Sequence, residues 1–369
     1  MELKKQSRNY GLDLMKIISM MMVIVLHINM HGGVYDALPD GTLKKYIVLF
    51  GEIICLCAVN CFAIISGYTG WRSTGIKPFR ILKIWGMCAF FSLFFTLSAV
   101  YLKVIPFSLK AILLDIFPIC SGEYWYITAY VGMYIISPLI NKAIQQLDSE
   151  IIRKVSFLLI GFVIISSFFG SRDPLKLNEG YSFVWLSIMY FLGGVIGKYR
   201  LTERISVKRG VLYLVLCDAT AFIAYVVSHF IIKNNRYEDA IPVLRYDGFF
   251  MILNAIFMLA IFEKIRFSEN KKNIIEKIIP FNLGVYVIHV NPIVWDYITK
   301  ERFVFVTEYN SFLIVIMTIL LTLLIYNICI FIEFLRSKIF AKHLILKKIY
   351  GLCRTVYFKV NHVLKLDRA

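Results

Sequence analysis

The sequence lacks the short patterns that mark most soluble enzymes and metal proteins. It has no C-x-x-C pair, Walker A sequence, H-E-x-x-H helix or EF-hand loop, and no G-x-G-x-x-G turn after a strand. Acidic residues are scarce, with 24 Asp and Glu against 41 Lys and Arg, so the formal net charge is +17. The basic residues stand in short clusters between apolar runs. We therefore expect them to face anionic lipid headgroups, and we expect no nucleic-acid partner.

The eight cysteines do not form a recognisable ligand or disulfide pattern. Cys57 and Cys61 share a helical face, which is a spacing that could suggest a metal ion. Small buried thiols in an apolar helix explain this spacing better. We therefore expect no metal site and no disulfide framework.

Apolar residues make up 59% of the chain and the mean hydropathy is +0.70. A soluble domain of this size needs far less apolar surface, so the composition indicates a protein that crosses a bilayer several times. Runs near the ~20 residues that a bilayer requires fall at 12–31, 46–68, 81–105, 125–144, 155–170, 182–198, 210–232, 247–264, 280–298 and 311–334. The sequence thus predicts an all-α membrane protein of about ten transmembrane helices. A shorter run at 107–119 is expected to lie at the interface or to re-enter the membrane.

The distribution of basic residues predicts the orientation. With the N-terminus in the cytoplasm and alternating sides, 29 Lys and Arg lie inside and 11 outside, which supports ten spans with both termini cytoplasmic. The first span has no small-residue cleavage site after it, so we expect it to be retained. Residues 1–335 are predicted to form one multi-span domain. Residues 336–369 are predicted to form a basic, amphipathic cytoplasmic tail.

Lys16 and His27 are ionisable residues within the first apolar run. Such groups are costly in a bilayer and usually face a cavity or a partner. They are eleven positions apart, which is about three helical turns, so they share one face at roughly 16 Å separation. Asp13 is expected either to pair with Lys16 or to cap the helix. The alternative for His27 is a structural hydrogen bond between helices.

Five stretches, in order along the chain, carry a resemblance to a known family: 11–27, 60–68, 80–83, 125–138 and 283–289. They are similar to a basic-x10-histidine motif, an F-F-x-x-S-G-Y helix ending, a basic pair opening the third helix, a W-Y-L signature and a late G-I-Y-L-I-H element. Over residues 8–335 the chain resembles the acyltransferase 3 family of integral membrane acyltransferases. That family has arginine where this chain has Lys16. Lysine keeps the charge but loses the bidentate fork.

The resemblance implies transfer of an acyl group, usually acetyl, from cytoplasmic acyl-CoA to a hydroxyl of a cell-surface or cell-wall glycan, across a bacterial cell membrane. Acetyl-CoA is then a co-substrate, and no cofactor is bound permanently. His27 and Lys16 form the expected catalytic pair, with His27 as general base. Donor-binding candidates are Lys16, Arg72, Arg80 and Lys83, for which ordinary positive-inside charge is the alternative explanation. A covalent acyl-histidine is an alternative to direct transfer.

Further candidates for the acceptor side of the cavity are Glu52, Glu123, Trp125, Tyr126 and His289. Glu52 either orients His27 or lies at the headgroup level. The two aromatic residues either belong to an interfacial belt or stack on a sugar. His289 is a candidate second residue of the cavity.

A transporter or flippase of a lipid-linked glycan is the alternative function, and a membrane scaffold without chemistry is a third. Transporters usually contain inverted repeats and broken helices, and the sequence shows neither. The presence of two ionisable groups on one helical face argues against a scaffold. Oligomerisation is left open.

Overall fold

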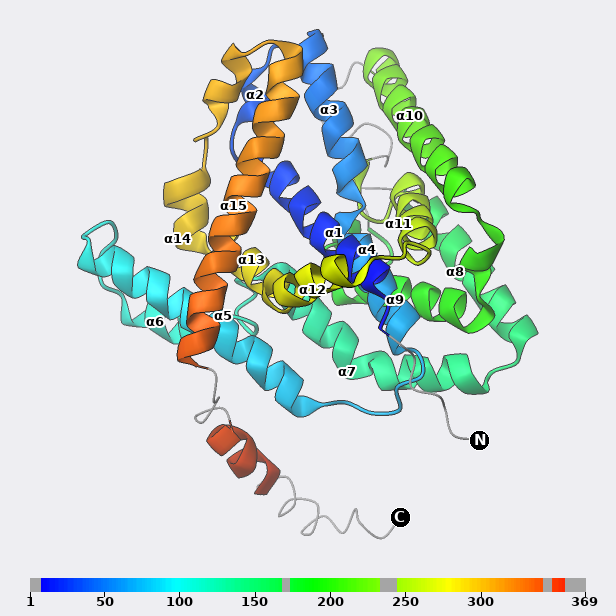
Figure 1. Ribbon diagram of the computed structural model, residues 1–369, viewed down its shortest axis with the longest axis horizontal. Coiled ribbons are helices and arrows are strands. Elements are labelled where there is room, and N and C mark those ends of the chain that lie inside the picture. Colours follow the sequence, from blue (N-terminus) through cyan, green and yellow to red (C-terminus); the bar gives the residue numbers. More distant parts are fainter. Residues whose placement is uncertain (1–7, 168–172, 233–243, 341–346, 356–369) are drawn as a thin grey trace.

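The computed structural model describes residues 8–167, 173–232, 244–340 and 347–355, and every regular element in these ranges is helical (Figure 1). The α-helices are α1 (Tyr10–Asn29), α2 (Val34–Ala37), α3 (Leu43–Leu56), α4 (Ala58–Gly70), α5 (Pro78–Tyr101), α6 (Leu109–Ile116), α7 (Trp125–Gln146), α8 (Ser149–Ser167), α9 (Phe183–Tyr199), α10 (Val207–Ile232), α11 (Phe249–Phe262), α12 (Glu269–Ile278), α13 (Asn282–His289), α14 (Pro292–Val294) and α15 (Ser311–Ile339). The shorter turns are η2 (Asn178–Gly180), η3 (Leu201–Arg204), η5 (Ile279–Phe281), η6 (Trp295–Thr299) and η7 (Val304–Glu308). A last helical stretch covers 347–355.

Six helices of the described chain are long and apolar enough to cross a membrane. They are Tyr10–Asn29, Leu43–Gly70 (α3 with α4), Pro78–Tyr101, Trp125–Gln146, Val207–Ser228 and Ser311–Ile339. A seventh span is formed if Glu269–His289 and Pro292–Thr299, which are bent by 58°, are counted together. The helical membrane protein is thus confirmed, and the expectation of no broken helix was wrong.

The other expected spans form helices that do not meet the same test. α9 and α11 are apolar but have only 17 and 14 residues, fewer than the ~20 that a bilayer requires. α8 has 19 residues, and three of its first six are charged. The predicted tail falls partly outside the described residues, and α15 continues past 335 to Ile339. The count of ten spans and the side on which the termini lie stay predictions.

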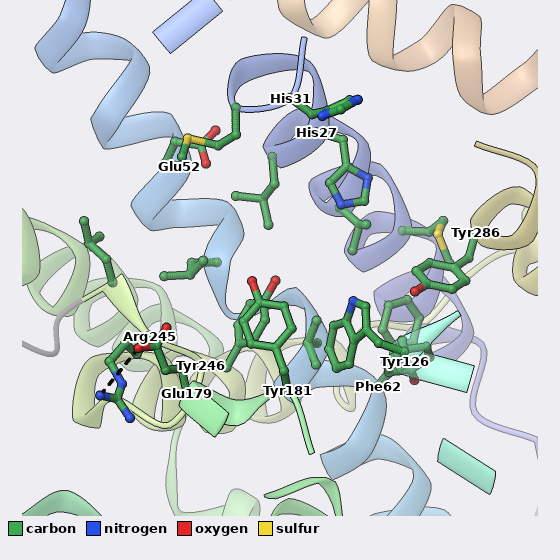
Figure 2. A pocket seen from close by; sticks show the side chains of 18 of the residues that line it. His27, His31, Glu52, Phe62, Tyr126, Glu179, Tyr181, Arg245, Tyr246 and Tyr286 are labelled. Carbon is green, nitrogen blue, oxygen red and sulfur yellow. Dashed lines mark ion pairs between the residues drawn. The ribbon is translucent and has the colours of Figure 1, made fainter. Parts of the chain in front are cut away.

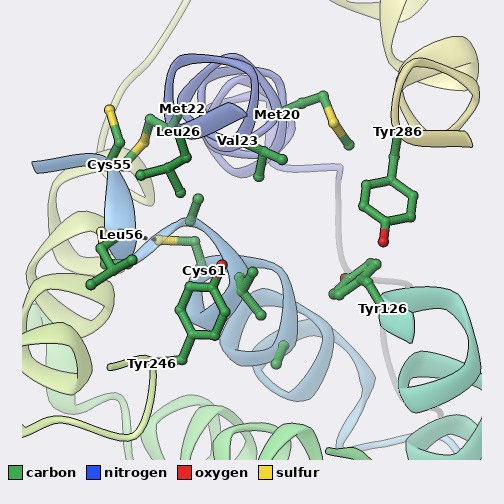
Figure 3. Close-up of a cluster of buried hydrophobic side chains, with 14 of the residues drawn as sticks. Met20, Met22, Val23, Leu26, Cys55, Leu56, Cys61, Tyr126, Tyr246 and Tyr286 are labelled. Carbon is green, nitrogen blue, oxygen red and sulfur yellow. Dashed lines mark hydrogen bonds between the residues drawn. The ribbon is translucent and has the colours of Figure 1, made fainter. Parts of the chain in front are cut away.

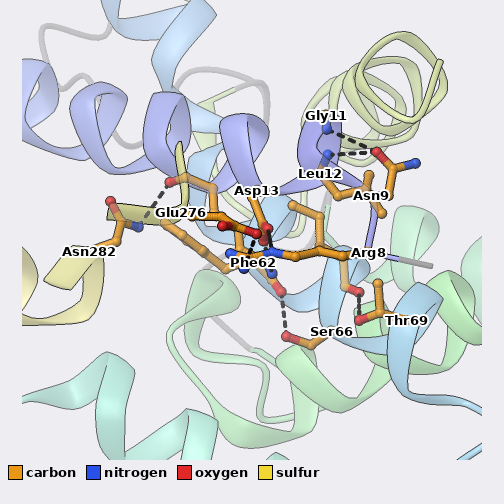
Figure 4. Close-up of polar contacts among 12 residues, drawn as sticks. Arg8, Asn9, Gly11, Leu12, Asp13, Phe62, Ser66, Thr69, Glu276 and Asn282 are labelled. Atoms are coloured by element: carbon orange, nitrogen blue, oxygen red, sulfur yellow. Dashed lines mark hydrogen bonds and ion pairs between the residues drawn. The ribbon is translucent and has the colours of Figure 1, made fainter. Parts of the chain in front are cut away.

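Helix α1 lies in the middle of the bundle (Figure 1) and contacts α3, α4, α11, α13 and α15. Its N-cap is Asn9, whose Oδ1 accepts hydrogen bonds from the backbone N–H groups of Gly11 and Leu12 (Figure 4). The glycine at position 11 lets α11 approach α1 closely. A Cβ at this position would overlap the carbonyl oxygen of Phe262. Figure 3 shows the buried face of α1, including Met22 and Leu26, packed against α3 and α4.

The contact between α4 and α9 depends on glycine. A Cβ on Gly67 would overlap the carbonyl oxygen of Tyr190, and a Cβ on Gly193 would overlap that of Ile64. The two backbones can therefore approach closely, as small residues allow in membrane bundles. Gly67 is thus a packing residue of this contact.

Large apolar side chains remain exposed on the outer helices. Phe157 on α8 is 78% exposed and Phe312 on α15 is 73% exposed. A surface of this kind needs an apolar surrounding. It fits helices whose outer faces contact lipid.

Candidate active site

Two cavities lie along α1. The first, here the His27 cavity, has a volume of about 340 Å³ and is lined by His27, His31 and Glu52 among others. The second, here the Lys16 cavity, has a volume of about 500 Å³ and is lined by Lys16 and Arg80 among others. Lys16 and His27, which share one face of α1, thus line two neighbouring cavities.

His27 is hydrogen-bonded to His289, the last residue of α13. The Nδ1 atom of His27 lies 3.0 Å from Nε2 of His289, and Nδ1 of His289 lies 2.6 Å from the carbonyl oxygen of Val285. A carbonyl oxygen only accepts, so the Nδ1 of His289 carries a proton. With both rings neutral, Nε2 of His289 accepts from the Nδ1–H of His27. The lone pair of His27 then resides on Nε2, for which the described residues provide no hydrogen bond.

Trp295 completes the surroundings of His27. The indole ring meets the imidazole of His27 edge-on, with centroids 4.7 Å apart, and stacks on His31 at 3.7 Å. The Nε2 of His31 is 2.9 Å from the carbonyl oxygen of Trp295 and donates to it. Sequence reasoning missed both residues. The four-residue spacing of His31 from His27 was the one available signal, because it places both on the same helical face.

A polar network holds the break between α13 and α14. Asn291 caps α14 by accepting the N–H of Ile293 at 3.0 Å, and its Nδ2 donates to the hydroxyl of Tyr124 at 2.9 Å. Ser92 bonds that hydroxyl at 3.0 Å and donates to Oε1 of Glu123 at 2.6 Å. Burial raises the pKa of the Glu123 carboxyl. Glu123 lines neither the His27 cavity nor the Lys16 cavity, and in this structure it supports the break.

Glu52 faces the His27 cavity from α3 (Figure 2). It is only 1% exposed, and its Oε1 has no hydrogen-bond partner among the described residues. A buried acceptor without a partner is costly. The geometry therefore marks Glu52 as a residue that could bind a hydroxyl or another donor in the cavity.

Aromatic rings form the opposite part of the wall. Trp125 lies 4.6 Å from Tyr181 and 6.1 Å from Tyr246 between ring centroids, and Figure 2 shows the two tyrosines side by side. Burial raises the pKa of Tyr246 well above its ordinary value, so its hydroxyl stays protonated. Beside them Arg245 is held by Asp247 through two contacts of 2.9 and 2.8 Å. A flat apolar wall with a few polar groups suits a sugar ring.

The Lys16 cavity is lined by cations and tyrosines. The Nζ of Lys16 lies 3.2 Å from Asp13, which also pairs with Arg8 at 2.7 Å (Figure 4). Asp13 thus pairs with Lys16, and Asn9 caps the helix. Arg80 donates to the hydroxyl of Tyr130 at 2.7 Å. The long cationic side chains of Lys16 and Arg80 therefore line the same space.

The other two predicted donor contacts lie elsewhere. Arg72 stacks over Trp71 and Lys83 lies over Phe79, both on the exposed side, and neither lines the cavity. Lys77, which was not among the predicted residues, does line it. Its position just before α5 resembles any interfacial lysine in the sequence, so no sequence signal distinguished it.

The two cavities share three lining residues, Met20, Phe62 and Tyr126. These side chains, here the partition, come from α1, α4 and α7. The ring centroids of Phe62 and Tyr126 are 5.9 Å apart. The partition is thus a wall that the Lys16 cavity and the His27 cavity have in common.

The apolar helices, with a histidine pair enclosed among them, define a multi-pass membrane protein with a buried site suited to proton transfer. A family model described as an acyltransferase domain matches residues 9–335. The chain therefore belongs to the acyltransferase 3 family, and it is an acyltransferase. Neither the curated proteins nor the solved structures compared with the chain gave a match.

Proposed function

We propose that this protein transfers an acetyl or other short acyl group from acyl-CoA in the Lys16 cavity to a sugar hydroxyl in the His27 cavity. The observation that carries this proposal is the pair of cavities along α1, one with cations and one with a histidine pair. The predicted orientation would place the Lys16 cavity on the cytoplasmic side and the acceptor, a cell-surface or cell-wall glycan, outside a bacterial membrane.

The donor would be held by its phosphates. Lys16, Lys77 and Arg80 line one cavity, and point charges bind phosphate oxygens through charge-assisted hydrogen bonds. A phosphate near Lys16 would compete with Asp13 for the ammonium group. Arg72 and Lys83 could reach only the part of CoA that projects out of the cavity.

The chemical step follows from the tautomer of His27. Nε2 removes the proton of the acceptor hydroxyl while its oxygen attacks the thioester carbonyl, so a C–O bond forms and the C–S bond breaks. The imidazolium then returns the proton to the leaving thiolate, giving CoA with a free thiol. His289 is a positioning residue in this scheme, since it fixes which nitrogen of His27 carries the proton.

The acceptor would lie between Glu52 and the aromatic wall. Trp125 and Tyr126 offer ring faces for a sugar, and the unpartnered Oε1 of Glu52 could accept a hydrogen bond from another hydroxyl of the same sugar. These contacts would direct one hydroxyl toward His27.

The alternative, a transporter or flippase of a lipid-linked glycan, is favoured by the break between α13 and α14, because broken helices are common in transporters. Radiolabelled acetyl-CoA added to membranes that contain the full chain and the cell's own glycans separates the two. We expect label in the glycan fraction, and labelling at least about 100-fold slower with His27→Ala at equal expression. Glycan movement without label would support the alternative, and near-normal labelling with His27→Ala would end the proposal.

A further inference from the structure

We propose that the partition of Met20, Phe62 and Tyr126 selects the acyl group by size. This inference rests on the proposed function, because it needs an acyl group that moves from the Lys16 cavity toward His27. The partition is the wall that both cavities share.

The partition lies on the line between donor and base. Along α1, Met20 follows Lys16 by four residues and precedes His27 by seven. At 1.5 Å per residue these steps are about 6 Å and about 10 Å along the axis, and both spacings keep the side chains on one helical face. A thioester that reaches the base from the cation side must therefore bring its acyl group to the partition.

Two of the three side chains are held firmly. Met20 is 2% exposed and Tyr126 is 6% exposed. The Tyr126 ring is braced by Tyr286 at 5.4 Å and by Tyr130 at 6.2 Å between centroids. Figure 3 shows that Met20, Tyr126 and Tyr286 lie on three different helices. Closely packed side chains of this kind yield little to an additional methylene group.

Phe62 is the member of the partition with room to respond. It is partly exposed and lines both cavities. Its ring lies beside Tyr126 in Figure 2. The length of the acyl chain that fits beside Tyr126 therefore depends most directly on the volume at position 62. A tight pocket discriminates against one extra methylene by about 10- to 200-fold.

The test compares acyl donors within one variant. Membranes with the full chain, wild type or with Phe62→Ala, Phe62→Leu or Phe62→Trp, are given radiolabelled acetyl-, propionyl- or butyryl-CoA, and label in the glycan fraction is measured. The butyryl-to-acetyl ratio of kcat/KM is independent of how much of a variant has folded. We expect this ratio to be below about one tenth in the wild type and to rise at least tenfold in Phe62→Ala. Phe62→Leu should be intermediate, and Phe62→Trp should lower acetyl transfer as well.

Phe157→Ala is the matched control, because Phe157 is 78% exposed on α8, outside both cavities. Its ratio should equal that of the wild type. Acetyl transfer with an unchanged ratio in Phe62→Ala and Phe62→Leu would overturn the size selection and leave the proposed function standing. Absence of label from all three donors in the wild type would overturn both.

Discussion

Replacing His289 by leucine should slow acyl transfer without weakening donor binding. The side chain accepts the Nδ1–H of His27 at 3.0 Å and is itself anchored to Val285 at 2.6 Å. Leucine leaves the Nδ1–H without its partner and removes the preference for a lone pair on Nε2. A buried donor without a partner costs about 1–3 kcal/mol. With tenfold per 1.4 kcal/mol, the expected loss in kcat is about 5- to 150-fold.

Glutamine at the same position is the conservative variant. Its amide oxygen can accept from His27, and its amide nitrogen can donate to the carbonyl of Val285. His289→Gln should therefore keep more of kcat than His289→Leu. Loss of the base itself, in His27→Ala, should cost about 10²- to 10⁴-fold, which sets the lower limit of the series.

The assay is the initial rate of label transfer at varied acetyl-CoA, normalised to the amount of folded protein. The KM for acetyl-CoA should stay constant, because His289 lines no part of the Lys16 cavity. A kcat for His289→Leu within twofold of the wild type would refute the tautomer argument. So would a loss that appears in KM while kcat is unchanged.

Variants at three other positions, Lys16, Glu52 and Gly67, test the donor site, the acceptor site and the packing. Lys16→Ala should raise the KM for acetyl-CoA about tenfold, whereas Lys16→Arg should stay within about threefold; an unchanged KM in Lys16→Ala would remove it from the donor site. Glu52→Leu should raise the KM for the isolated glycan more than Glu52→Gln, which keeps a hydrogen-bonding oxygen; equal values would separate Glu52 from the acceptor. Gly67→Val should lower the melting temperature in detergent, because its side chain would overlap the backbone at Tyr190, whereas Gly161→Ala, with open space around it, should not.

Helical periodicity was enough to place Lys16 and His27 on one face of the first helix, whatever surrounds that helix. The structure has cavities along that face. The all-helical membrane class followed from composition alone. The number of spans stays a prediction, because α9 and α11 have only 17 and 14 residues and α8 begins with charged residues.

The sequence could not predict contacts between residues that are far apart along the chain. Trp295 lies 268 positions from His27, and Arg245 comes from a connection before α11, so no local pattern links them to the first helix. For Glu123 the sequence predicted a cavity residue, and the structure places it outside the cavity. It stands two residues before Trp125, which lines the cavity, yet its carboxylate turns to Ser92. Adjacent residues in a connection can point to different surroundings, and periodicity offers no guide there.

The break between α13 and α14 explains why both His289 and Trp295 can contact one imidazole. In a straight helix these residues, six positions apart, would point in directions about 120° apart around the axis. The chain bends by 58° between His289 and Pro292, and both rings lie beside His27, with centroids 5.1 and 4.7 Å from that of its imidazole. In the proposed mechanism, the same feature that resembles a transporter brings a tautomer-fixing histidine and an apolar ring to the proposed base. The network from Asn291 to Glu123 stabilises that bend, so its polar residues act on the base through geometry without touching a substrate.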